Sequence, residues 1–146
     1  MGVARVADER TRWFKIAYTV LAWILAACVV VQVFFAGLAL FYRASFWIQH
    51  RVFVQFFEYI PIVILLLLLI GRAPRGKGLY WPQLALLALI MVQYVTGGSS
   101  MGSLFSAFHP VSAMVMFWVA TIAIQRGQRW EVAQSEKASQ EVTAGS

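Results

Sequence analysis

Residues 16–42 read IAYTVLAWILAACVVVQVFFAGLALFY, an apolar run that Gln32 alone interrupts. Three further apolar runs follow at 52–70, 79–95 and 108–124. Each has about 17–27 residues, and a helix of that length matches a hydrocarbon core of roughly 30 Å. Because lipid offers the backbone no hydrogen-bond partner, such runs form helices. The sequence therefore predicts an all-α polytopic membrane protein with four transmembrane helices in an up-down-up-down bundle.

The composition excludes an ordinary soluble enzyme and a disordered chain. Hydrophobic residues make up 61% of the 146 residues and charged residues 12%, whereas soluble domains carry about 45–50% and about 25%. A soluble domain of this length could not bury so much apolar surface. The length allows one domain, and the single cysteine, Cys28, cannot form an internal disulfide.

The expected boundaries follow from the runs and the polar breaks between them. We expect a cytoplasmic N-terminal segment at 1–12, a four-helix transmembrane domain at 13–130 with helices at about 13–42, 47–71, 79–96 and 105–127, and a disordered cytoplasmic tail at 131–146. The tail is assigned as disordered because it is polar and lacks apolar periodicity.

Positive charge is concentrated on one side of this expected bundle. Of the 12 lysine and arginine residues, all but Arg43 and Arg51 flank the two termini or the connection between the second and third runs. The positive-inside rule then predicts a multi-pass protein of the bacterial inner membrane with both termini in the cytoplasm. The net charge of +6 is thus a topology signal, and we expect the lipid bilayer as a partner and no nucleic acid.

The two histidines stand at corresponding places in the chain. His50 opens the second helix and His109 opens the fourth, and their distances from the basic residues at the other ends of these helices agree to about one turn. The second and fourth helices of such a bundle run parallel and lie diagonally across its core. Two imidazoles facing each other at one depth are the ligands of a b-type haem, whereas zinc needs three or four ligands.

The neighbouring residues favour a flat apolar cofactor. On the fourth helix the side of His109 carries small residues, Ala113 and Ala120, and on the second helix the side of His50 carries Val54, Phe57 and Pro61. Arg43 and Arg51 stand at the outer rim, where haem propionates need cations. The alternative is that both histidines are interfacial, with His109 capping its helix ahead of Pro110.

Other polar residues fall in the outer half of the expected bundle. Glu58 is the sole acid within the hydrocarbon region, and Gln55, Gln93 and Tyr94 lie in the same half. A structural interpretation has Glu58 protonated and hydrogen-bonded to a glutamine. The functional alternative makes it a proton or quinone-headgroup site. Pro61 should break or kink the second helix, because it cannot donate a backbone hydrogen bond.

Two resemblances agree with this arrangement. The segments Phe34-Phe35-Ala36-Gly37-Leu38 and Phe108-His109-Pro110-Val111 resemble a family of small bacterial four-helix integral membrane proteins. Histidines that open the second and fourth of four helices also resemble one half of haem A synthase, which has two such bundles in tandem. The resemblance covers residues 13–126 and implies His50 and His109 as ligands. Haem A synthase halves have a glutamate where this chain has Trp47, and a homodimer would have to supply the second half, so methyl-group oxidation is not implied.

The sequence thus predicts a membrane protein that binds one haem b through His50 and His109, with Arg43 and Arg51 at the propionates. We expect electron transfer with a redox partner or a quinone, and no stand-alone enzyme activity. Two alternatives stay open. One is a cofactor-free membrane scaffold or accessory subunit, and the other is a small transporter or lipid-binding bundle centred on Glu58.

Overall fold

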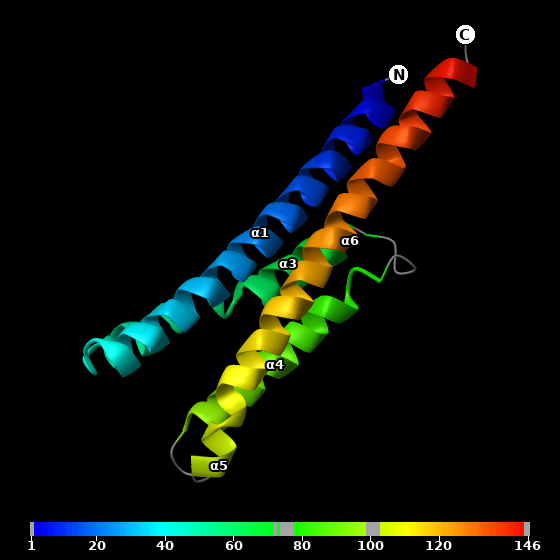
Figure 1. Ribbon diagram of the computed structural model, residues 1–146. Coiled ribbons are helices and arrows are strands. Elements are labelled where there is room, and N and C mark those ends of the chain that lie inside the picture. The colour runs from blue at the N-terminus through cyan, green and yellow to red at the C-terminus, as the bar shows by residue number, and fades with distance from the viewer. Residues whose placement is uncertain (1, 72, 74–77, 99–102, 145–146) are drawn as a thin grey trace.

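The computed structural model describes residues 2–71, 73, 78–98 and 103–144, and it is helical through most of them (Figure 1). In chain order the elements are α1 (Gly2–Phe41), α2 (Phe46–Phe57), α3 (Ile60–Ile70), α4 (Trp81–Gly97), α5 (Ser103–Ser106) and α6 (Phe108–Ala144). The described residues contain no strand. The all-α class predicted from the apolar runs is therefore confirmed.

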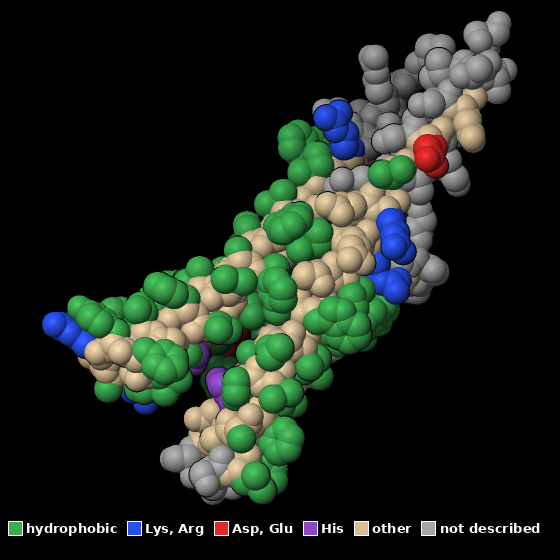
Figure 2. Space-filling model, in the orientation of Figure 1, with side chains coloured by type: hydrophobic (Ala, Val, Ile, Leu, Met, Phe, Trp, Pro, Cys, Tyr) green, Lys and Arg blue, Asp and Glu red, His purple; other side chains and the backbone are tan. Residues whose placement is uncertain are grey.

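Three helical segments are long and apolar enough to cross a membrane: Arg12–Phe41, Phe46–Ile70 and Leu104–Trp130. The fourth segment, α4, has 17 residues, which is at the short end of the range that spans a hydrocarbon core. Large apolar side chains cover the outer surface, and Trp23, for example, is 56% exposed. Figure 2 shows hydrophobic side chains over most of the visible face, as expected of a surface that meets lipid.

The helices form a ring of four neighbours. The segment α2–α3 packs on α1, α3 also packs on α4, α4 packs on α6, and α6 returns to pack along α1. The pairs α1/α4 and α2–α3/α6 are consequently the diagonals, as an up-down-up-down bundle requires. Both described ends of the chain lie at one end of the bundle, here called the terminal end (Figure 1).

The terminal half of the bundle is closed by small residues. Ala22 and Ala26 on α1 meet Ala120 and Ala123 on α6 within one buried cluster. Small side chains allow two membrane helices to approach closely, so that van der Waals contact stabilises the pair. Larger residues fill the rest of this cluster: Leu25 from α1, Ile64 and Leu68 from α3, Leu86 and Ile90 from α4, and Ile124 from α6.

The second predicted helix is interrupted where Pro61 was expected to act. It is divided into α2 and α3 at Glu58 and Tyr59, and Pro61 is the second residue of α3. Proline lacks a backbone donor and its ring crowds the preceding turn, so the α-helical ladder cannot continue unchanged through it. The break lets α2 follow α1 while α3 reaches α4.

The expected tail and N-terminal segment differ from the structure. Helix α6 continues to Ala144 and α1 begins at Gly2, so the prediction of disorder at 131–146 is wrong for the described residues of the tail. Alanine, glutamate, glutamine and lysine dominate that stretch, and these are strong helix formers. They extend an existing helix, which avoids the cost of nucleating a new one. Arg72, Arg75 and Lys77, which contributed to the predicted orientation, lie outside the described residues.

The contact between α1 and α6 gives a test of this packing. A Cβ atom at Gly127 would lie 2.6 Å from the Thr19 hydroxyl and 2.8 Å from the Tyr18 ring, whereas one at Gly37 would meet nothing within 4 Å. We expect Gly127→Ala to reduce the free energy of unfolding by about 1–3 kcal/mol, because overpacking forces the two helices apart. Titration with a denaturing detergent, followed by tryptophan fluorescence, measures this change.

Gly37→Ala is the matched control and should leave the unfolding midpoint unchanged or slightly higher. Equal midpoints for the two variants would contradict the close approach of α1 and α6.

Candidate functional site

The two histidines meet at the end of the bundle opposite the chain termini, here called the histidine end. His50 lies near the start of α2 and His109 is the second residue of α6. Their ring centroids are 6.1 Å apart, and the ring planes are inclined by 58°. At this end the molecule divides into two arms, one formed by α1 and α2 and the other by α4 and the start of α6. Figure 2 shows histidine side chains on both walls of the hollow between these arms. The structure thus brings together the two side chains that the sequence pairs by depth.

His50 is held by Gln32 from the neighbouring helix α1. The Nδ1 atom of His50 lies 3.1 Å from the backbone carbonyl oxygen of Gln32. In return, the side-chain amide Nε2 of Gln32 donates to the backbone carbonyl of His50 over 2.7 Å. The two residues therefore form a reciprocal pair of hydrogen bonds that joins α1 to α2.

His109 is held in the same way by Gln93 from α4. Its Nδ1 atom lies 3.2 Å from the backbone carbonyl oxygen of Gln93, and Gln93 Nε2 donates to the backbone carbonyl of His109 over 3.3 Å. The Thr96 hydroxyl oxygen lies 3.3 Å from the same Nδ1 atom. We call these two arrangements the Gln32–His50 clasp and the Gln93–His109 clasp.

The clasps determine which nitrogen of each ring carries the proton. A carbonyl oxygen can only accept, so an Nδ1 atom bonded to it must be the protonated nitrogen. At His109 the Thr96 hydroxyl donates to the Val92 carbonyl over 2.7 Å, and its oxygen is therefore left to accept from the ring as well. Both imidazoles are consequently Nδ1–H tautomers, with Nε2 as the basic nitrogen. This is the arrangement that outer-shell partners impose on metal-binding histidines.

The walls beside the rings are apolar and differ between the two sides. Trp47 meets the His50 ring edge-on at 5.4 Å, and Phe57 is buried further along α2. Beside His109 the neighbouring residue is Gly97, which has no side chain. A Cβ atom at Gly97 would lie 3.1 Å from the Cε1 atom of the His109 ring. The sides of the two helices that the sequence assigns to the histidines turn inward, with Pro61, Met116 and Ala120 buried.

Glu58 lies at the break between α2 and α3, and it is half-buried. It accepts a hydrogen bond from the Tyr94 hydroxyl on α4, so its partner is a tyrosine and not the glutamine that the sequence analysis expects. The bond joins the α2–α3 segment to α4 between the two arms. Gln55, by contrast, is exposed, and no described hydrogen bond brings it to the histidines.

The two arginines are exposed at the histidine end. The guanidinium group of Arg43 lies over the Tyr42 ring, 5.3 Å from its centroid. The described contacts include no hydrogen bond or ion pair from Arg43 or Arg51 to the histidines. Contact between these two arginines and haem propionates therefore stays a prediction.

Gln32 is the site residue that sequence reasoning missed. Gln93 stands four residues before the end of α4 and Gln32 stands nine residues before the end of α1, and each is followed on the next long helical segment by its histidine, at separations of 18 and 16 residues. That repeated order is the signal in the sequence. It was overlooked because Gln32 lies within an apolar run, where a lone polar residue suggests packing.

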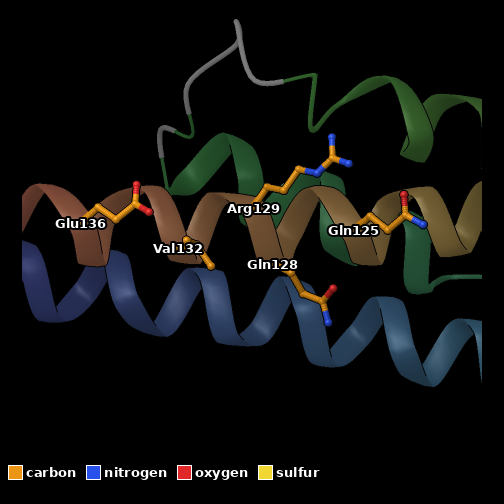
Figure 3. Close-up of a pocket in the computed structure, with 5 residues that line it drawn as sticks. All are labelled: Gln125, Gln128, Arg129, Val132 and Glu136. Atoms are coloured by element: carbon orange, nitrogen blue, oxygen red, sulfur yellow. The ribbon is translucent and has the colours of Figure 1, made fainter.

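A shallow hollow on α6 lies far along the helix from the histidines and is not a competing site. Gln125, Gln128, Arg129, Val132 and Glu136 line it, and all five come from a single helix. In Figure 3 Arg129 and Gln128 point to opposite sides of α6, so their side chains do not converge. Another hollow, lined by Phe35, Val52 and Phe56 among others, has apolar walls and faces outward between α1 and α2.

The donor set at the histidine end is two imidazoles. Among the described residues, no group of three or more histidine, cysteine, aspartate or glutamate side chains is placed to hold a metal ion. A site for a fully protein-ligated zinc ion is therefore not formed by this part of the chain. Two neutral imidazoles suit a metal whose remaining ligands come from a macrocycle.

Fold and site together define an all-α membrane bundle with a pair of clasped histidines at one end. Residues 32–97 match a family described as a family of unknown function (DUF6220). The matched segment contains the whole Gln32–His50 clasp and Gln93. Neither the curated proteins nor the solved structures include a match to this chain.

Gly97 offers a test of the geometry around His109. We expect Gly97→Ala to displace the ring by a few tenths of an ångström, because the new methyl group would lie 3.1 Å from Cε1 and 3.2 Å from Nδ1. The Cε1–H resonance of His109 should shift in the NMR spectrum of the detergent-solubilised protein, while that of His50 should move much less. Gly37→Ala is the control, and a spectrum of Gly97→Ala identical to the control's would contradict the contact.

Proposed function

We propose that the chain holds one b-type haem between His50 and His109 and transfers electrons within the membrane. The observation that carries the proposal is the pair of facing imidazoles, 6.1 Å apart, with each Nδ1 atom bonded to a backbone carbonyl. A metal–imidazole bond is about 2 Å long, so one ion bound to both rings keeps their centroids roughly 6 Å apart. The observed separation agrees with that value.

Two further features concern the surroundings of the imidazoles. The first is Gly97, where an added Cβ atom would press on the His109 ring, so that glycine lets this ring lie close against α4. The second is Gln32, whose Oε1 atom is buried and has no hydrogen-bond partner. A buried acceptor of this kind normally has a hydrogen-bond partner, and since a haem with ionised propionates offers no donor, that partner would be an ordered water.

The remaining residues have supporting roles in this proposal. Arg43 and Arg51 are exposed at the histidine end and provide the positive charge that haem propionates require. A haem held by His50 and His109 would supply one-electron transfer. The electron donor or acceptor would be a protein redox partner or a membrane quinone, and Glu58 would handle protons or support the site.

The location of the protein is part of the same proposal. We assign it to the bacterial inner membrane with both termini in the cytoplasm, because all lysine and arginine residues but Arg43 and Arg51 flank the two termini or the connection between the second and third apolar runs of the sequence. The histidine end would then face the periplasmic side. A haem there would lie near the outer surface of the membrane, within reach of a partner on that side.

The test is a visible spectrum of the protein purified in detergent after expression with ample haem. We expect a sharp α band of low-spin haem b on reduction with dithionite. We also expect its loss in His50→Ala and in His109→Ala, because each variant removes one axial ligand. Gln55→Ala is the matched control, since Gln55 is an exposed polar residue of the same helix as His50, and it should keep the band.

A colourless protein that is still folded would overturn the haem proposal. The cofactor-free scaffold or accessory subunit would then account for the bundle, with both histidines as structural residues. Loss of solute flux in Glu58→Gln, without loss of folding, would instead support a small transporter.

A further inference from the structure

The two clasps are equivalent parts of one repeated arrangement. In each half of the chain a helix carries a glutamine in its second half, and the next long helical segment carries a histidine near its start. The same atoms bond in the same directions in both halves. Exchanging α1 with α4 and the α2–α3 segment with α6 also maps the helix contacts onto themselves. The two histidines therefore occupy equivalent places in the two halves of the chain.

The glutamine side chain adds a second hydrogen bond between the two helices of each clasp, beside the bond from the histidine ring to the backbone carbonyl. A single bond from Nδ1 to a carbonyl lets the histidine-bearing helix slide and rotate along its neighbour. The second bond, from Gln32 Nε2 to the His50 carbonyl at 2.7 Å, fixes both the separation and the rotation of the two helices. In an apolar medium neither partner gains a replacement from water, so the register is strongly held.

We infer that Gln32 and Gln93 are positioning residues, which hold His50 and His109 as Nδ1–H tautomers with their Nε2 atoms available to a ligand between them. The tautomer is a property of the chain itself, whereas the effect on a bound haem rests on the proposed function. Partners of this kind orient a ligating histidine and increase its basicity, and their loss typically lowers affinity 10–100-fold.

The two clasps should differ in strength. The amide bond of Gln93 is longer, 3.3 Å, and His109 has a second acceptor in the Thr96 hydroxyl. The described contacts of the His50 ring include no such second acceptor, and its other neighbour is the edge of Trp47. Loss of the Gln32 side chain should therefore disturb its histidine more than loss of the Gln93 side chain.

The first experiment uses the full chain without haem. Methionine has nearly the volume of glutamine and cannot form the amide bond, so Gln32→Met and Gln93→Met remove the clasps with little change in packing. Gln55→Met is the control. Nitrogen-15 NMR of labelled histidine in detergent micelles distinguishes a protonated Nδ1 from a protonated Nε2. We expect Nδ1–H at both histidines in the wild type and the control, and a mixture of tautomers at the unclasped histidine in each variant.

The second experiment titrates the same four proteins with haemin. We expect affinity to fall about 10–100-fold in Gln32→Met, less in Gln93→Met, and to be unchanged in Gln55→Met. If the wild type binds no haemin, the proposed function fails while the NMR measurement still decides the inference. Retention of Nδ1–H at His50 in Gln32→Met and at His109 in Gln93→Met would overturn the inference, whatever the titration shows.

Discussion

A hydrocarbon environment provides no hydrogen-bond partner, and this constraint acts on the side chains of the bundle as well as on its backbone. Several polar groups between the helices accordingly form hydrogen bonds from one helix to another. The clasps join α1 to α2 and α4 to α6, Glu58 and Tyr94 join the α2–α3 segment to α4, and Gln83 donates to the Tyr18 hydroxyl between α4 and α1. Each bond connects two different helices. The two clasps and the Glu58–Tyr94 bond therefore join neighbouring helices, and the Gln83–Tyr18 bond spans the diagonal pair α1/α4. Such bonds specify the arrangement of the helices, which apolar surfaces alone do weakly in lipid.

The two ends of the bundle are built on different principles. At the terminal end, alanines and Gly127 allow close contact between α1 and α6. A cation also lies over an aromatic ring there, because the Lys15 Nζ atom is 5.7 Å from the centroid of the Trp130 ring. At the histidine end the helix breaks before Pro61. As a result α2 packs on α1, and only α3 packs on α4. One proline thus separates a closed, rigid half from a half with room between its walls. A site that needs both precise ligands and space for a group between them requires such a division.

Much of this arrangement could be predicted from the sequence, and the misses have physical causes. Long apolar runs predict helices because lipid permits few alternatives, and the matched depths of His50 and His109 were sufficient to pair them. The helical tail does not follow from polarity, which is shared by disordered chains and exposed helices, although alanine and glutamate extend a helix readily. Gln32 was missed because its role depends on a bond to a residue on another helix. The partner of Glu58 was wrong for the same reason: reach and rotation of side chains decide it, and neither is visible in residue spacing.

Both ends of the chain lie at the terminal end of the bundle (Figure 1), where α3 also ends and α4 begins, while both clasps lie at the opposite end. The covalent order of the two halves is therefore immaterial to the site. A circularly permuted chain that starts at α4, runs through α6 and continues by a linker into α1 would present the same four side chains. So would two halves made as separate polypeptides.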